Sequence, residues 1–326
     1  MGGASVNGRV FSWKEAFWAS PGPRSLKSAA VLYLKGVCMG SADIIPGVSG
    51  GTIALITGIY EKLLQAIKSA DMGMARKALT FDIKGALARI HIRFLLCIFL
   101  GIGTAILSLA RLMNYLLHYH PVFIWSLFFG LIAASVLVVG KRVDKWNIGT
   151  GFFFLAGAGV AYFIVNLIPV STPEDSWFIF FSGMLAICAM ILPGLSGAFI
   201  LLILGKYEFI TATLKNPFFA QNILIILIFC SGCLVGLLGF SRVLNYLIRK
   251  YHGLTLAFLT GLMAGCMQKI WPWKQVLEVR IINGHEHILW GGNTLPPAFD
   301  VQVAAAAGLA GLGFIAVIVL ENLSAE

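Results

Sequence analysis

The chain contains little charge. Asp, Glu, Lys and Arg make up 12% of its 326 residues, about half the share found in an average soluble protein. Hydrophobic residues make up 59%, and the mean hydropathy is +0.88. This composition excludes an ordinary soluble domain and predicts an all-α integral membrane protein.

The sequence also lacks the motifs of several functional classes. No nucleotide-binding motif is present, so we expect no ATP-driven step. All six histidines fall in predicted loops or at interfaces, which leaves Ser49 and Ser196 without a general base and disfavours a lipid-phosphate phosphatase. Cys230 and Cys233 lie inside an apolar run, where packing is the expected role. We therefore predict no enzyme activity, no metal and no cofactor.

Residues 1–26 have no continuous apolar core, so we expect no secretory signal there. Trp13, Phe17 and Trp18 are interleaved with Lys14 and Glu15. This pattern favours a short helix at the membrane interface, with tryptophan at the depth of the lipid headgroups.

Apolar runs long enough to cross a membrane recur along the chain, given that a span needs about 20 residues. They are 94–117, 122–140, 151–168, 223–240, 254–267 and 301–321. The net charge of +10 lies in short loops between these runs, which indicates a topology signal rather than a nucleic-acid partner. Its distribution predicts cytoplasmic N- and C-termini.

One motif occurs twice. Ala42–Glu61 and Ala189–Glu208 each contain an apolar run, the sequence Pro-Gly-(Val/Leu)-Ser-Gly, a second apolar run and Gly-x-Tyr-Glu. Pro and Gly interrupt a helix, and backbone released from a helix in a membrane must be covered by protein or water. We therefore predict a re-entrant, broken-helix hairpin in each copy, over 27–67 and 177–214.

The similarity continues beyond the hairpins at one common offset. Gly101, Arg111, Asn114, Tyr115 and Gly130 recur as Gly232, Arg242, Asn245, Tyr246 and Gly261. Each repeat, 27–141 and 177–270, then consists of a hairpin and two spans. Because the single linking span 151–168 separates them, the repeats are predicted to be inverted, as in secondary transporters.

The segment 271–300 is the one long loop expected outside the cytoplasm. Asn283-Gly284 lies between two strand-like runs and predicts a β-hairpin. His285 and His287 would share a strand face, but no third ligand is evident, so a solvated face is the expected role rather than a metal site.

The two helix breaks are the candidate substrate site. The first N–H groups of a helix lack internal acceptors and carry partial positive charge, so they favour an anion such as phosphate. The predicted binding residues at the breaks are Ser49, Gly50, Gly51, Thr52, Ser196 and Gly197. The alternative is that Ser49 and Ser196 only cap helices.

Arg111 and Arg242 are repeated cations within or at the edge of a span. Such a position usually faces a partner or a watery cavity, and the guanidinium fork suits phosphate. Asn114 and Asn245 lie three residues further on the same helix faces and are predicted to orient the arginine or the ligand. The alternative is that both arginines extend to the headgroups.

Asp43 precedes the first break, whereas Met190 stands at the equivalent position of the second copy. Asp43 is a candidate for coupling to a proton or a sodium ion, or else neutralises an arginine. Glu61 and Glu208 are further coupling candidates, although contacts with Lys62 and Lys206 would also explain them.

The residues Asp43–Thr52 with Gly58–Glu61, and Leu192–Gly197 with Gly205–Glu208, resemble those of a bacterial membrane family linked to polyprenyl phosphate translocation. The resemblance covers Lys27–Trp271. It implies a multi-pass protein of the bacterial cytoplasmic membrane that returns undecaprenyl phosphate from the outer to the inner leaflet for cell-wall and surface-polymer synthesis. A secondary transporter or channel for a small soluble anion is the alternative. Ala198 replaces Gly51 in the second copy, which leaves open whether both breaks contact phosphate.

Overall fold

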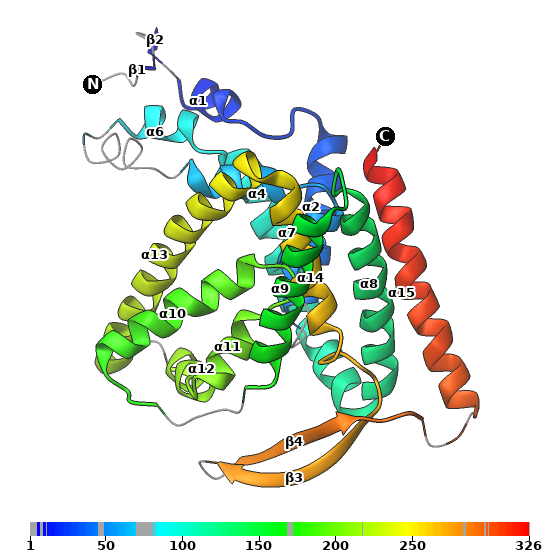
Figure 1. The fold of residues 1–326 in the computed structure, drawn as a ribbon. Coiled ribbons are helices and arrows are strands. Elements are labelled where there is room, and N and C mark those ends of the chain that lie inside the picture. Colours follow the sequence, from blue (N-terminus) through cyan, green and yellow to red (C-terminus); the bar gives the residue numbers. More distant parts are fainter. Residues whose placement is uncertain are drawn as a thin grey trace.

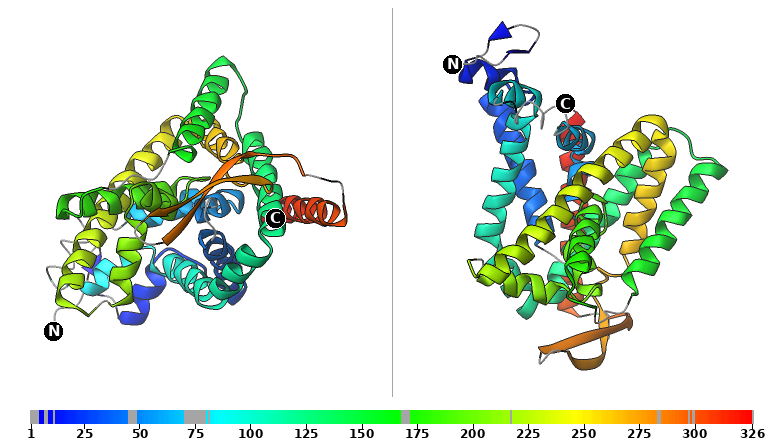
Figure 2. Two further views of the ribbon diagram at one scale, coloured as in Figure 1. Left: turned by 90° about the horizontal axis from the view of Figure 1, so that it is seen from below. Right: turned by 90° about the vertical axis from the view of Figure 1, so that its left-hand side faces the viewer.

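The computed structural model is a bundle of helices with a long β-hairpin at one end and a short pair of strands near the N-terminus at the other (Figures 1 and 2). It describes residues 5–6, 9–10, 12–44, 49–69, 80, 82–167, 172–216, 218–282, 285–296, 298 and 300–325. The Pro46 break and Asn283-Gly284 lie outside these ranges, as do 70–79 and 81 of the predicted basic loop.

The first half begins with the paired strands β1 (Ser5–Val6) and β2 (Arg9–Val10), followed by α1 (Trp13–Ala19), α2 (Leu26–Asp43), α3 (Gly50–Ile56), α4 (Tyr60–Lys68), α6 (Ile83–Arg89), α7 (Ile92–Tyr119), α8 (Pro121–Lys141) and α9 (Ile148–Val165). The second half contains α10 (Ser176–Ile191), α11 (Gly197–Ile203), α12 (Tyr207–Lys215), α13 (Ala220–Lys250), α14 (His252–Cys266), β3 (Lys274–Ile282), β4 (His285–Asn293) and α15 (Val301–Ala325). The predicted interfacial helix is α1, and the predicted hairpin is the antiparallel pair of β3 and β4.

Within the described part of the chain, five helices are long and apolar enough to cross a membrane: α7, α8, α9, α13 and α15. The sixth predicted span forms α14, which has 15 residues and is about 22 Å long, against about 30 Å of hydrocarbon. α14 is therefore not one of the five helices that are long enough by themselves, and a full span at 254–267 stays a prediction. Most of α14 is buried among neighbouring helices, which explains why its sequence is apolar.

Both predicted hairpins turn back towards the end at which they begin. In the first, Lys27 near the start of α2 and Lys62 of α4 line the same cavity. In the second, Lys206, just before α12, donates a hydrogen bond from Nζ to the Thr172 carbonyl, just before α10 (2.8 Å). The axes of α11 and α12 differ by 115°. The chain therefore enters and returns in both copies.

Equivalent glycines bring the first leg of each hairpin against the long helix that follows it. A Cβ on Gly36 of α2 would lie 2.5 Å from the Ile98 carbonyl oxygen of α7, and one on Gly183 of α10 would lie 2.5 Å from that of Phe229 in α13. Ile98 and Phe229 are equivalent positions, like Gly36 and Gly183. The same backbone approach, which only glycine allows, thus occurs in both copies.

The helix that follows the long helix of each half, α8 in the first half and α14 in the second, packs against a helix of the opposite half. A Cβ on Gly130 of α8 would lie 1.8 Å from the Ala310 carbonyl of α15, and one on Gly261 of α14 would lie 2.0 Å from the Phe154 carbonyl of α9. Gly130 and Gly261 are equivalent in the sequence repeat. α15 therefore packs against α8 in the same way as α9 packs against α14. Each half thus supplies a helix that packs against the other half.

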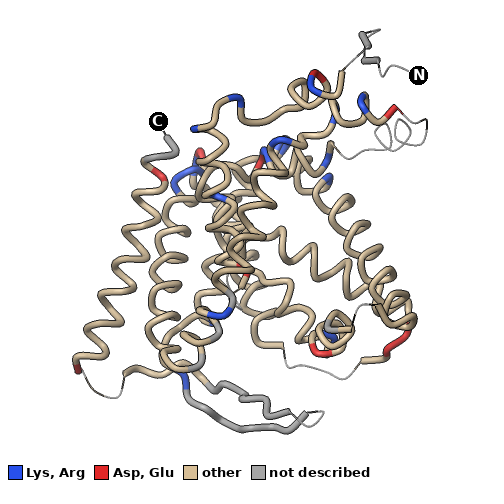
Figure 3. The backbone as a smooth tube through the Cα atoms, turned by 180° about the vertical axis from the view of Figure 1, so that it is seen from behind, with Lys and Arg blue, Asp and Glu red and all other residues tan. Residues whose placement is uncertain are grey.

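The two long helices run in opposite directions. His91, directly before α7, shares a cavity with Gln65 of α4, whereas His252, the first residue of α14 and two residues beyond the end of α13, lies 3.7 Å from Glu61 of α4. The start of α7 and the end of α13 are therefore both beside α4 (Figure 1). Lys and Arg gather mainly at this end, which also carries α1 and the end of α15 (Figure 3).

The glycine contact between α14 and α9 gives the first prediction. We expect Gly261→Ala to force the two helices apart, because the added methyl group would overlap the Phe154 carbonyl. Overpacking of this kind costs about 1–3 kcal/mol, so the thermal unfolding midpoint in detergent should fall. Gly159→Ala in α9 is the matched control, since nothing lies within 4 Å of its Cβ. Equal midpoints for the two variants would contradict the packing.

Candidate functional site

Side chains of the first hairpin hold the second break. The Ser49 hydroxyl lies 3.1 Å from the carbonyl oxygens of both Met190 and Leu192, and the Tyr60 hydroxyl donates to the carbonyl of Ile191 (3.0 Å). In return, the Gly194 amide donates to Thr52 Oγ1 (2.9 Å). The two breaks, far apart in the sequence, therefore touch each other. We call this contact of Ser49, Thr52 and Tyr60 with residues 190–194 the crossing.

The reason for these contacts lies in how α10 ends. The last carbonyls of a helix have no partner within the helix, and Pro193 lacks the N–H that would continue the pattern. Gly194 then takes a φ of +90°, a conformation that favours glycine. Ser49 and Tyr60 supply the missing donors, so the first hairpin completes the end of α10.

The amide end of α3 is already occupied in this structure. The Gly50 amide donates to Asp43 Oδ1 (2.7 Å), and the Gly51 amide donates to Ser49 Oγ (3.1 Å). The Thr52 amide donates to the Ser49 carbonyl (2.9 Å). The first three amides of α3 therefore already have acceptors in this conformation, and a carboxylate stands beside the first of them.

The second copy lacks this arrangement. Met190 replaces the carboxylate, and Ser196 is the N-cap of α11 but makes no side-chain capping hydrogen bond in the described structure. A Cβ on Gly197 would lie 2.6 Å from the Ala186 carbonyl, so the start of α11 lies close against α10. Simple capping therefore describes Ser49 but does not describe Ser196.

Two cations hold the opposite end of α3. Arg142, just after α8, donates from Nη1 and Nη2 to the carbonyls of Leu55 (3.0 Å) and Ile56 (3.1 Å). Lys35 Nζ donates to the Thr57 carbonyl (2.8 Å). Cations favour the C-terminal end of a helix. The sequence does not predict either role, because the break motif carries no sign of partners so distant in the chain.

The repeated arginines are placed differently from each other. Arg111 is exposed on α7, whereas Arg242 is half-buried on α13 and donates from Nη1 to the Leu238 carbonyl of its own helix (2.7 Å). Asn245 is 3% exposed, and the side chain of Asn114 lies outside the described structure. Arg242 also has a further interaction partner.

The two repeated glutamates lie away from the crossing contacts. Glu61 is at the end of the molecule that carries α1, where Oε1 is 3.7 Å from His252 Nε2, while Asp144 Oδ2 is 3.8 Å from His252 Nδ1. The expected contact between Glu61 and Lys62 is thus replaced by one with His252. Glu208, at the start of α12, is half-buried and has an interaction partner.

A pair of lysines lies on the other side of α11. Lys269 Nζ is 4.9 Å from the ring centroid of Phe199, and Lys274 Nζ is 5.3 Å from that of Trp125. Lys274 also donates to the Lys269 carbonyl. Burial, with the neighbouring charge of Lys269, lowers the pKa of Lys274 to about 8. No pattern in the sequence predicts this pair.

The crossing is polar, buried and enclosed by apolar helices. Ser49 is 1%, Thr52 0% and Ser196 6% exposed. Hydroxyls, amides and one carboxylate thus meet at a point where water does not reach the side chains of Ser49 and Thr52. Such a cluster can bind a small anion only after a rearrangement that admits it.

Comparison with known proteins gives a consistent result. The family model described as undecaprenyl phosphate translocase-like matches residues 39–288. A polyprenyl-phosphate transporter of Vibrio cholerae is 44% identical over 256 residues, covering 78% of this chain and 82% of that protein. A polyprenyl-phosphate transporter of Staphylococcus aureus is 32% identical over 255 residues, covering 73% and 85%.

No solved structure matches the chain. The family match covers the first hairpin from Met39 onwards, the whole second hairpin and the helices between them. The matched region therefore includes both sides of the buried crossing. The chain is a polytopic membrane protein of the undecaprenyl phosphate translocase-like family.

Proposed function

We propose that this protein moves polyprenyl phosphate, as undecaprenyl phosphate, from the outer to the inner leaflet of the bacterial cytoplasmic membrane, so that the carrier is reused for cell-wall and surface polymers. Both curated relatives are named polyprenyl-phosphate transporters. The observation that carries the proposal is the buried contact of Ser49 and Thr52 with the second break. It brings hydroxyls and amides of both halves to one point, as one headgroup requires.

The physical task is to carry a charged phosphate past hydrocarbon. An ion without hydrogen-bond partners in such a medium costs many kcal/mol. In the proposed site, amides and hydroxyls at Ser49–Thr52, Ser196 and Gly197 replace water around the phosphate. The isoprenoid tail stays in lipid throughout, so the protein needs a path only for the headgroup.

Asp43 gives the site a way to couple transport to protons. Its carboxylate binds the Gly50 amide that the phosphate would also use, and two anions at one helix end repel each other. Protonation removes the negative charge of Asp43 and weakens its hold on the amide. Phosphate entry is thus coupled to proton uptake, and deprotonation drives its release. A sodium ion beside Asp43 would relieve the same repulsion.

The proposed transport cycle uses the two halves as inverted repeats. The hairpins 27–67 and 177–214 begin from opposite faces, and α7 and α13 run in opposite directions. Alternating access follows when the halves exchange conformations. The end rich in Lys and Arg, which carries α1 and the end of α15, faces the cytoplasm by the positive-inside rule.

Arg111 and Arg242, with Asn114 and Asn245, are proposed to bind the headgroup as it enters or leaves the crossing. By the repeat, both arginines lie at the same level of their helices, six residues beyond the equivalent pair Ala105 and Gly236. This pair packs against the first leg of each hairpin. A Cβ added to Gly40 of α2 would lie 2.9 Å from the Cβ of Ala105, and a Cβ added to Gly236 would lie 2.7 Å from the Met184 carbonyl oxygen of α10. Both arginines thus stand near the level at which the first hairpin legs end.

The test of this function is a liposome assay with purified protein and labelled polyprenyl phosphate in one leaflet. We expect the label to change leaflet, with no release of inorganic phosphate and no leak of a soluble anion. Release of inorganic phosphate would instead identify a phosphatase. Anion flux without lipid transfer would identify the soluble-anion transporter or channel that the helix breaks also permit.

Ser49→Ala removes one of the hydroxyls that join the two breaks. The loss of its hydrogen bonds should cost about 1–2 kcal/mol, and we expect lipid transfer to fall about tenfold because the headgroup loses a donor. Ser41→Ala is the matched control, since its hydroxyl donates to the Val37 carbonyl of its own helix and not to the second break in the described structure. Equal transfer rates in the two variants would contradict a role for Ser49 in binding.

Asp43→Asn should abolish the dependence of transfer on an ion gradient while leaving transfer without a gradient. An asparagine oxygen can still accept from the Gly50 amide, so the fold is expected to persist. Asp82→Asn is the control, because Asp82 likewise accepts from a helix amide, that of Gly85 (3.0 Å). Proton and sodium gradients are imposed separately. If Asp43→Asn remains as gradient-dependent as Asp82→Asn, Asp43 is not the coupling group.

A further inference from the structure

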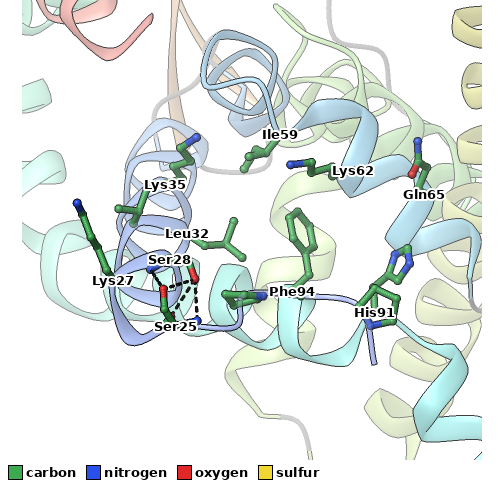
Figure 4. A pocket seen from close by; sticks show the side chains of 14 residues that line it. Ser25, Lys27, Ser28, Leu32, Lys35, Ile59, Lys62, Gln65, His91 and Phe94 are labelled. Carbon is green, nitrogen blue, oxygen red and sulfur yellow. Dashed lines mark hydrogen bonds between the residues drawn. The ribbon is translucent and has the colours of Figure 1, made fainter. Parts of the chain in front are cut away.

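A cavity of about 770 Å³ lies at the end of the molecule where α2 and α7 begin (Figure 4). Its walls come from the segment before α2, from α2 and α4, and from the start of α7. The repeated motif does not predict this cavity, because its walls come from segments on both sides of the motif. It is separate from the buried crossing and open to the outside.

The cavity is strongly basic. Lys27, Lys35 and Lys62 line it together with His91, and none of the described residues that line it is acidic. The charge of Lys62 acts on Lys35 across the space. Like charges held together repel, and an anion between them relieves that repulsion. The electrostatics therefore fit a small anionic group.

One side of the same cavity is apolar. Leu32 and Phe94 are 8% and 7% exposed, and Figure 4 shows both side chains extending into the space between Lys35 and Lys62. Ile59 also contributes. A ligand that combines an anion with a hydrocarbon chain satisfies both sides, whereas a free inorganic anion satisfies only the lysines.

Lys35 links this cavity to the crossing. Its Nζ donates to the Thr57 carbonyl at the C-terminal end of α3, and the Gly50 amide held by Asp43 lies at the other end of that helix. Seven helical residues span about 10 Å. A headgroup in the cavity is thus one short helix away from the buried contacts.

We propose that this cavity binds the phosphate monoester of the transported lipid on the cytoplasmic side. Lys35 and Lys62 bind the phosphate, and the first isoprene units lie against Leu32 and Phe94. The cavity is the last protein site before the lipid enters the inner leaflet. This inference rests on the proposed function, whose failure the experiment detects separately.

The first experiment is lysine footprinting of the full-length protein in detergent with an amine-reactive acylating reagent and mass spectrometry. Farnesyl phosphate should slow acylation of Lys62 but not of Lys68, which lies on the same helix outside the cavity. Farnesol should protect neither lysine. Inorganic phosphate should protect Lys62 only at concentrations at least tenfold higher, because it gains nothing from Leu32 and Phe94.

Variants give a second measurement. Lys62→Glu should weaken farnesyl phosphate binding about tenfold, and Lys62→Gln about threefold, because each lowers the positive charge at the phosphate. Lys68→Glu and Lys68→Gln are the matched controls. Lys35 is not chosen for substitution, since its hydrogen bond to the Thr57 carbonyl also supports α3. The binding of farnesol should be equal in all variants.

Four outcomes decide the proposal. Selective protection of Lys62 by farnesyl phosphate supports it. Equal protection by inorganic phosphate overturns it in favour of a free-phosphate site. If Lys62 is not protected although the wild-type protein moves polyprenyl phosphate between leaflets, the cavity inference is wrong and the proposed function stands. If neither protection nor transfer occurs, the proposed function fails, and the inference fails with it.

Discussion

The structure depends on one constraint: every backbone amide and carbonyl released by a broken helix in an apolar bundle must find a hydrogen-bond partner. The end of α10 obtains its partners from Ser49 and Tyr60, and the end of α3 obtains them from Arg142 and Lys35. For α10, the partners come from the opposite half. The breaks therefore weaken each helix but join the two halves.

The contacts between helices are of two physical kinds. At the crossing, small hydroxyls bond to carbonyls, and such bonds can be exchanged for bonds to a ligand. Around it, glycines such as Gly130 and Gly261 bring helix backbones into contact, and such packing tolerates little change. In the proposed cycle the packed pairs move as units, while the hydrogen bonds at the crossing are remade.

The two copies differ most where charge is involved. Asp43 faces the start of α3, whereas Met190 stands at the equivalent place, and the Tyr60 hydroxyl is buried while Tyr207 is 41% exposed. The carbonyls of Thr57 and Leu204 stand at equivalent positions, at the ends of α3 and α11. The charged Lys35 donates to the Thr57 carbonyl, whereas the neutral hydroxyl of Thr172 donates to the Leu204 carbonyl. Similar backbones thus carry different electrostatics in the two copies.

The sequence by itself determined the features that depend on local pattern. Low charge and long apolar runs fix the membrane class, Pro-Gly fixes the two breaks because neither residue continues a helix, and the repeat fixes which positions are equivalent. Asn283-Gly284 likewise predicts the hairpin of β3 and β4.

Only the tertiary structure decided which groups meet. The partners of the breaks, such as Arg142 for α3, are remote in the sequence, and hydrogen bonds leave no periodic signal. The sequence also does not predict that α15 packs against α8 and α9 against α14. The glycines on α8 and α14 allow a close approach but do not specify which helix makes it. Burial also explains the short length of α14, since a helix surrounded by protein need not match the thickness of the bilayer.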